Sequence, residues 1–162
     1  MEPKSAMRHS EEPRLALRSK LSGFAQGARV VTADGRLPIE HLTAGERIIT
    51  RDGGMQRLSW IDSAYVTTHA VRIAPQALGH SKPEERTVLP EGQRLLLRDW
   101  RAKAMYGHSV VGVPAFRLAD GDYVRRIGPR SLRLFRLGFE RQHTVYVDGL
   151  EMLAHTAPFP QA

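Results

Sequence analysis

Histidine is the residue type on which most chemistry in this chain would depend, because its 162 residues include no cysteine. Without cysteine there is no thiolate nucleophile, no disulfide and no thiolate metal ligand. The histidines stand at positions 9, 41, 69, 80, 108, 143 and 155, and no two have His-x-x-x-His spacing. His143 and His155 could converge only through a hairpin. Zinc sites need three or four ligands at defined spacing, so we expect no metal site, and without a phosphate-binding glycine loop we expect no cofactor.

A second chemical feature is a stretch rich in arginine near the C-terminal third of the chain, which carries a formal net charge of +7. Its only acidic residue is Glu140. Such a cluster could bind phosphates, or it could be a solvated strand face. Aromatic residues are not interleaved as single-strand binding requires, so we do not expect nucleic acid, while an unidentified protein partner stays open. The candidate binding residues are Arg125, Arg126, Arg130, Arg133 and Arg136.

The elements that must position these residues are short β-strands. The segment Arg29–Thr32 recurs eighteen residues later as Arg47–Thr50, and an Asp-Gly pair follows each copy closely. Short apolar runs separated by Gly, Pro and Asp continue through the chain, which is typical of an all-β fold with hairpins. Helical turns are predicted only at 39–42, 99–107 and 149–155. The predicted strands are 29–32, 47–50, 58–61, 71–73, 87–89, 95–97, 110–113, 123–126, 132–137 and 144–147.

A longer-range repeat indicates two related halves. Leu42–Ile48 and Leu118–Val124 share the pattern Leu-x-x-Gly-acid-x-β-branched, and each follows a proline at similar spacing. In such a unit the leucine packs inward, and the glycine permits the tight turn before the next strand. We therefore expect two β subdomains related by a pseudo-two-fold rotation, with short helical turns only.

These residues resemble the opening of a Hint domain, the module shared by hedgehog autoprocessing domains and inteins, and in particular its bacterial branch. The resemblance rests on Phe24-x-x-Gly-x-x-Val30, Thr32-x-Asp-Gly35, Pro38-Ile-x-x-Leu42, Gly45-Glu-x-Ile48 and Thr50-Arg-Asp-Gly53. The segments "SVVGVPAFRLADGDYVRR" and "FERQHTVYVDGLEMLAH" are similar to its closing half. The resemblance implies a flat, disk-like or horseshoe-shaped all-β fold.

The resemblance also implies self-cleavage, in which a Cys or Ser before the phenylalanine attacks the preceding carbonyl and a histidine protonates the leaving nitrogen. Here the first position is Gly23, which has no side chain. The family's Thr/Ser-x-x-His pair falls on Pro90 and Gln93, neither of which can do that work. The terminal asparagine of inteins is impossible in a chain that has none. Only the late histidine is kept, as His143, so the sequence predicts a Hint scaffold with a degenerate active site.

Three functions from different classes follow. The first is a domain inactive in self-cleavage that serves as a stable β module or binding domain. The second is residual autoproteolysis near Ser22, by an N-to-O acyl shift assisted by His143. The third is a basic adaptor that binds nucleic acid or an acidic partner through the arginine cluster.

The expected organisation is a loosely ordered lead over residues 1–22, a β domain over 23–158 and a tail over 159–162. No apolar run reaches the ~18–20 residues that a membrane span needs, and the first twenty residues lack the apolar region of a secretory signal. We therefore expect a cytoplasmic location, with non-classical export left open.

Overall fold

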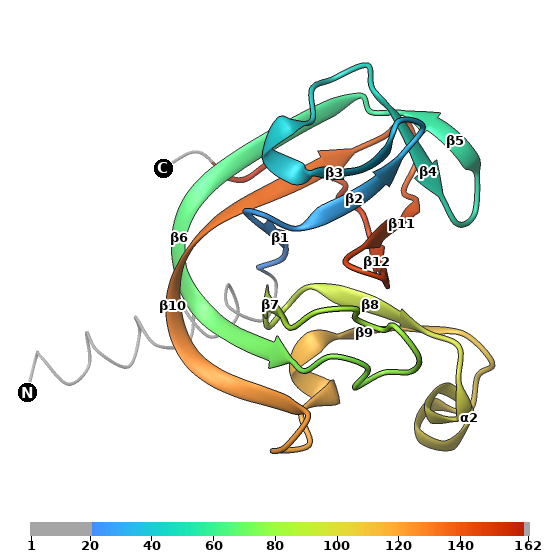
Figure 1. The fold of residues 1–162 in the computed structure, drawn as a ribbon, viewed down its shortest axis with the longest axis vertical. Coiled ribbons are helices and arrows are strands. Elements are labelled where there is room, and N and C mark those ends of the chain that lie inside the picture. The colour runs from blue at the N-terminus through green and yellow to red at the C-terminus, as the bar shows by residue number, and fades with distance from the viewer. Residues whose placement is uncertain (1–20, 161–162) are drawn as a thin grey trace, which may run out of the picture.

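The computed structural model describes residues 21–160, and within them almost every element is a β-strand (Figure 1). Most of the predicted lead, and the last two residues of the predicted tail, lie outside that range. None of the helices described is both long and apolar enough to cross a membrane. The strands are β1 (Phe24–Ala25), β2 (Arg29–Thr32), β3 (Gly35–Pro38), β4 (Arg47–Thr50), β5 (Gly54–Arg57), β6 (Trp60–Ile73), β7 (Thr87–Pro90), β8 (Arg94–Leu97), β9 (Val111–Pro114), β10 (Val124–Gly138), β11 (Thr144–Val147) and β12 (Leu150–Leu153).

Two long strands form the frame of the molecule. β6 and β10 have 14 and 15 residues and pair antiparallel along their whole length. Figure 1 shows them as one curved ribbon that reaches from one end of the molecule to the other. The sequence predicted two separate strands in each of these segments, which is wrong. The predicted turn at Ile127–Pro129 is instead a β-bulge. Ile127 is the extra residue, and the φ of 75° at Gly128 lets the strand continue past it.

The other strands lie inside this arc, with β2 to β5 near one end of it and β7 to β9 near the other (Figure 1). By their hydrogen bonds, all the strands form two sheets. A four-stranded sheet has the order β1-β10-β6-β7, and an eight-stranded sheet runs β3-β2-β4-β11-β12-β8-β9, with β5 paired to β4. β2 and β4 pair through Thr32 and Ile48, which confirms that the two copies of the first repeat lie side by side. The result is a horseshoe-shaped all-β fold, as predicted.

The second repeat corresponds to two locally similar units. In the first, β3 ends at Pro38 and leads into the 3-10 helix η1 (Ile39–His41) and then β4. In the second, β9 ends at Pro114 and leads into the 3-10 helix η2 (Ala115–Leu118) and then β10. The repeated leucines are buried and the repeated glycines have φ values of 96° and 80°. The roles inferred from the pattern are therefore confirmed in both copies.

Two of the three predicted helical segments are helical. Residues 39–41 form η1, and Trp100–Tyr106 forms the one α-helix of the described chain, α2. The helix α2 begins after Asp99, whose side chain accepts a hydrogen bond from the Arg101 N–H, and ends at Gly107 in the left-handed conformation.

The third predicted helix, over residues 149–155, is wrong because this segment contains strand β12. Asp148 and Gly149 have φ values of 52° and 83°, which suit the two-residue turn of a β-hairpin. Val147 and Leu150 then pair directly across that turn. Turn geometry therefore overrides the weak helical pattern.

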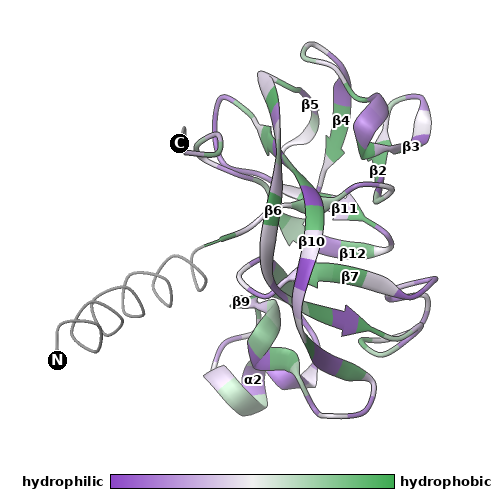
Figure 2. Ribbon diagram, turned by 90° about the vertical axis from the view of Figure 1, so that its left-hand side faces the viewer, coloured by the Kyte–Doolittle hydropathy of each residue, from purple (hydrophilic) through white to green (hydrophobic). Residues whose placement is uncertain are grey.

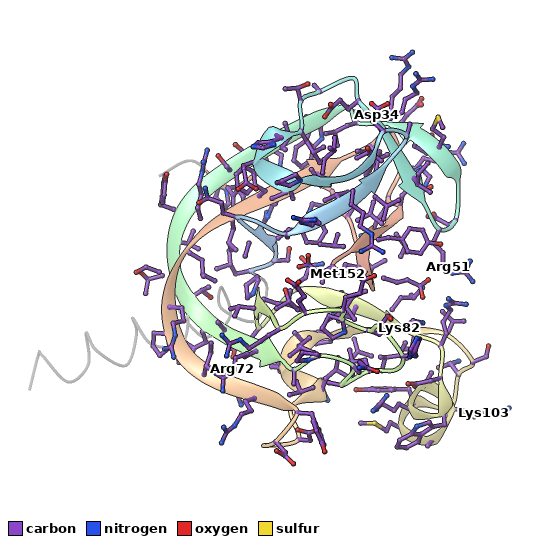
Figure 3. The ribbon with its side chains drawn as sticks, in the orientation of Figure 1. Asp34, Arg51, Arg72, Lys82, Lys103 and Met152 are labelled. Carbon is purple, nitrogen blue, oxygen red and sulfur yellow. The ribbon has the colours of Figure 1, made fainter. Side chains whose placement is uncertain are left out.

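The hydrophobic core contains residues from the strands of both sheets. Figure 2 shows hydrophobic and hydrophilic residues alternating along β6 and β10, as expected when one face of a strand is buried. Met152 is fully buried and lies in the middle of the molecule, whereas Asp34, Arg51 and Lys103 lie at its periphery (Figure 3).

Gly138, at the end of β10, provides a test of this packing. It pairs with Trp60, and the indole of that residue occupies the space where a side chain at position 138 would begin. Gly138→Ala should therefore lower the free energy of unfolding, measured by chemical denaturation, by about 1–3 kcal/mol through overpacking. Gly112→Ala is the matched control, because the added methyl would meet only the flexible Leu153 Cδ1 at 3.1 Å. Equal effects of the two substitutions would contradict this packing.

Candidate functional site

The peptide bond between Ser22 and Gly23 is the centre of the candidate site. Gly23 comes just before β1 and is buried. Its N–H donates a hydrogen bond of 2.9 Å to Oε1 of Gln93, 70 residues further along the chain. Gln93 is 1% exposed and is held by the turn between β7 and β8, in which its own N–H donates to the carbonyl of Pro90. The structure thus brings together two of the positions that the resemblance singled out.

The Gln93 side chain has a partner for each of its polar groups. Its Oε1 also lies 3.0 Å from Nε2 of His155. Its Nε2 donates to the carbonyls of Leu153 at 2.9 Å and of Arg94 at 3.1 Å. These bonds fix the orientation of the amide, because only its oxygen can accept from Gly23.

His155 is the second buried polar residue of the site. Its Nδ1 accepts a hydrogen bond of 3.1 Å from the N–H of Leu137, which places the proton of the neutral ring on Nε2, facing Gln93. Burial, helped by the positive charge of Arg136, lowers the pKa of His155 to about 3. The ring therefore stays neutral at physiological pH.

The sequence did not single out His155 for this site. It noted only that His143 and His155 could converge through a hairpin, and they do lie on either side of β11 and β12. Their side chains, however, contact different groups. No local pattern in the sequence points to His155, because its partners Leu137 and Gln93 lie 18 and 62 positions away.

His143, the histidine favoured by the resemblance, contacts other residues. Its Nδ1 lies 3.0 Å from Oδ2 of Asp52, and its ring packs edge-on against Phe139. Asp52 also accepts a bond from the Thr144 N–H. These contacts place His143 beside the loop after β4, while His155 is the histidine joined to the Gly23 junction through Gln93.

Ser22 contributes its backbone rather than its side chain to the contacts of the site. Its carbonyl accepts a hydrogen bond of 3.0 Å from Nε of Arg136. Ser22 also lines a pocket of about 310 Å³, together with Gln93, Arg136 and His155. Both the carbonyl and the N–H of the Ser22–Gly23 peptide are therefore held by side chains.

There is little space for a side chain at position 23. A Cβ there would lie 3.1 Å from Cβ of Leu134 and 3.2 Å from the carbonyl oxygen of Phe135. The φ of Gly23 is 156°, a value that residues with a side chain rarely adopt. Pro90, the other degenerate position, is buried at the end of β7 and pairs with Ala70.

The five candidate arginines of β10 make different contacts. Arg136 faces the junction, Arg126 pairs with buried Glu91 at 3.2 Å, and Arg133 packs against the rings of Tyr65 and Phe135. Arg125 lies opposite Arg72, and Arg130 donates to the carbonyl of Pro129. Part of the predicted cluster is thus taken up by contacts within the protein.

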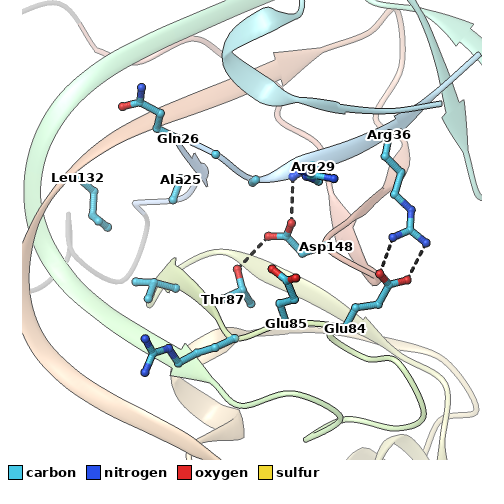
Figure 4. Close-up of a pocket in the computed structure, with 13 residues that line it drawn as sticks. Ala25, Gln26, Arg29, Arg36, Glu84, Glu85, Thr87, Leu132 and Asp148 are labelled. Atoms are coloured by element: carbon cyan, nitrogen blue, oxygen red, sulfur yellow. Dashed lines mark hydrogen bonds and ion pairs between the residues drawn. The ribbon is translucent and has the colours of Figure 1, made fainter. Parts of the chain in front are cut away.

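A larger pocket, of about 470 Å³, lies between the segment after β1 and the start of β7 (Figure 4). Several of its polar groups bond to one another. Arg36 and Glu84 form a two-pronged ion pair with both distances 2.6 Å, and Asp148 joins the Arg29 N–H to the Thr87 hydroxyl. Across residues 21–160 no three metal-binding side chains gather in one place.

Comparisons with known proteins agree with this architecture. A family model described as "Hint domain" matches residues 22–155. The solution structure of a bacterial intein-like domain from Clostridium thermocellum has a TM-score of 0.58 at 15% identity, covering 84% of this chain and 99% of that one. The crystal structure of the MchDnaB-1 intein has a TM-score of 0.53 at 11% identity, covering 82% and 99%. No match was found among curated protein sequences.

The buried neutral His155 predicts a pH dependence of stability. Its pKa is about 3 in the folded chain and near 6.5 when unfolded, so between these values the unfolded chain binds more protons. The contribution of this group to the free energy of unfolding is therefore fully present above the unfolded pKa and is lost as the pH is lowered. Between about pH 7.5 and pH 5 the loss is about 2 kcal/mol. His155→Gln retains a donor toward Gln93 but does not titrate. Denaturation at both pH values should show a smaller loss for this variant, and an identical loss would contradict the assignment.

Proposed function

The chain belongs to the Hint domain family, and we propose that it is a member that does not cleave itself and serves as a stable β module. The observation that carries this proposal is the 2.9 Å hydrogen bond from the Gly23 N–H to Oε1 of Gln93. In this bond an oxygen that can only accept faces the Gly23 nitrogen, to which self-cleavage would have to supply a proton.

The first support is the lack of a nucleophile. In the chemistry that the family implies, a side chain at the first position of the domain attacks the carbonyl before it. Gly23 has no such side chain, and the crowding by Leu134 and Phe135 leaves little room for one. The backbone is thus adapted to glycine at this position.

The second support is the direction of the proton. Cleavage of the Ser22–Gly23 bond requires that the leaving nitrogen of Gly23 gain a proton. Gln93 presents to this nitrogen an oxygen that can only accept, while its NH₂ group donates to Leu153 and Arg94. The Nε2–H of His155 is directed to the same oxygen. The junction is therefore bound as an intact peptide.

Residual autoproteolysis at Ser22 is the alternative. Its hydroxyl would attack the carbonyl of Leu21, and a base would have to accept the hydroxyl proton. His143 contacts Asp52, and His155 has its acceptor nitrogen bonded to the Leu137 N–H. Neither histidine is therefore placed to accept the Ser22 hydroxyl proton. Whether the chain cleaves itself tests this alternative directly.

We predict that the purified chain keeps its full mass for days at neutral pH, with or without added thiol or hydroxylamine. Intact-mass spectrometry measures this without any label. Gly23→Cys should also stay whole, because Gln93 still supplies no proton. Gln93→His, which restores a titrating group beside the Gly23 nitrogen, is the variant in which hydroxylamine cleavage should first become measurable.

Loss of the first 21 or 22 residues from the unmodified chain would contradict the proposal. If Ser22→Ala abolished that loss, the Ser22 hydroxyl would be the nucleophile and the alternative would stand. If Ser22→Ala had no effect, water would be the attacking group.

A further inference from the structure

Arg136 is the only charged side chain bonded directly to the junction among the residues that the structure describes. Its Nε donates to the carbonyl oxygen of Ser22 at 3.0 Å. Its Nη1 donates to the carbonyls of Ala157 at 3.3 Å and Pro158 at 3.4 Å. The ring of Phe159 packs over the guanidinium, with its centroid 4.3 Å away.

We propose that Arg136 is the carbonyl-binding residue of the Hint site, which holds and polarises the carbonyl of Ser22. This carbonyl belongs to the same peptide whose nitrogen Gln93 binds, so the two side chains hold opposite ends of one bond. The inference deepens the proposed function and rests on its identification of the Ser22–Gly23 peptide as the junction.

The surroundings of Arg136 make this contact strong. The side chain is partly buried, and burial lowers its pKa while nearby Asp62 raises it. Arginine stays protonated even in such sites. A charge-assisted bond to a carbonyl in partly desolvated surroundings is stronger than the same bond in water. The carbonyl thus faces a permanent positive charge.

The chemistry that this contact would assist can be written in full. Attack by water or hydroxylamine forms a new bond to the Ser22 carbonyl carbon and moves the carbonyl electron pair onto the oxygen, beside Arg136. The attacking group loses a proton, and collapse of the oxyanion breaks the bond to the Gly23 nitrogen, which takes up a proton. Stabilising such an oxyanion is often a large part of catalysis. Arg136 supplies that part, whereas Gln93 supplies no proton.

Arg136 also ties the junction to the C-terminal segment of the domain. Asp62 stands opposite Arg136 in the β6–β10 pairing, and its Oδ2 accepts the Phe159 N–H at 2.8 Å. The Phe159 ring lies 3.4 Å from where a Cβ of residue 23 would be. The segment 157–159, of which the sequence placed only residue 159 in the tail, therefore packs against the junction and the Arg136 side chain.

The direct test is a nuclear magnetic resonance measurement on the labelled, unmodified chain. The Gly23 amide reports the carbonyl carbon of Ser22 one bond away. We expect a through-hydrogen-bond coupling between Nε of Arg136 and that carbon. In Arg136→Met the coupling should vanish and the carbon resonance should shift upfield. Arg133→Met is the control, because Arg133 lies on the same strand but packs against Tyr65 and Phe135; it should change neither signal.

A second readout uses reactivity. In a Gln93→His background, Arg136→Met should slow hydroxylamine cleavage by about 10²-fold, as loss of an oxyanion donor typically does, whereas Arg133→Met should not. A folded unmodified chain without the coupling would overturn the inference even if it stayed whole. Cleavage of the unmodified chain with the coupling present would overturn the proposed inactivity and leave the Arg136 assignment standing. If Gln93→His does not cleave, the coupling alone decides.

Discussion

The candidate site depends on the hydrogen bonds of a single amide oxygen, Oε1 of Gln93. It accepts from the N–H of Gly23 and from Nε2 of His155, while the amide nitrogen ties the same side chain to Leu153 and Arg94. The bonds to Gly23 and His155 are buried, and an unpaired buried donor costs about 1–3 kcal/mol. Glutamine fits because it offers one acceptor and two donors on a neutral group. A neutral histidine at this position has one acceptor and one donor, so it could not make all four of these hydrogen bonds.

The β6–β10 ribbon sets the geometry around that oxygen. β10 pairs with β1 through Phe135 and Phe24, which fixes the start of the domain next to Arg136. The same strand supplies the Leu137 N–H that fixes the tautomer of His155. A continuous strand of 15 residues therefore positions the Ser22–Gly23 peptide, through Arg136 and β1, and the neutral ring of His155, through Leu137. The Gly128 bulge allows the strand to continue through a sequence that otherwise resembles a turn.

The sequence predicted the fold class because turn residues and β-branched runs are local signals. It could not predict that strands separated by Gly128-Pro129 are continuous, since pairing with β6 decides that. Family register located Gly23 and Gln93, but His155 is identified by bonds to residues 18 and 62 positions away, which no local pattern records. Arg136 was grouped with a basic cluster because charge alone does not show which face of a strand turns inward. Its partners, Ser22 and the segment 157–159, lie far from it in sequence.

Hydrogen exchange at the Gly23 amide tests the central claim most directly, because that N–H is the donor that Gln93 captures. The account predicts that this amide exchanges as slowly as the amides of the central strands, although it lies at the start of the domain. It also predicts that Gln93→Leu, which removes the acceptor, accelerates exchange at Gly23 more than at Val145, a buried residue of β11. Exchange at the rate of an exposed amide in the unmodified chain, with the central strands still protected, would contradict the account.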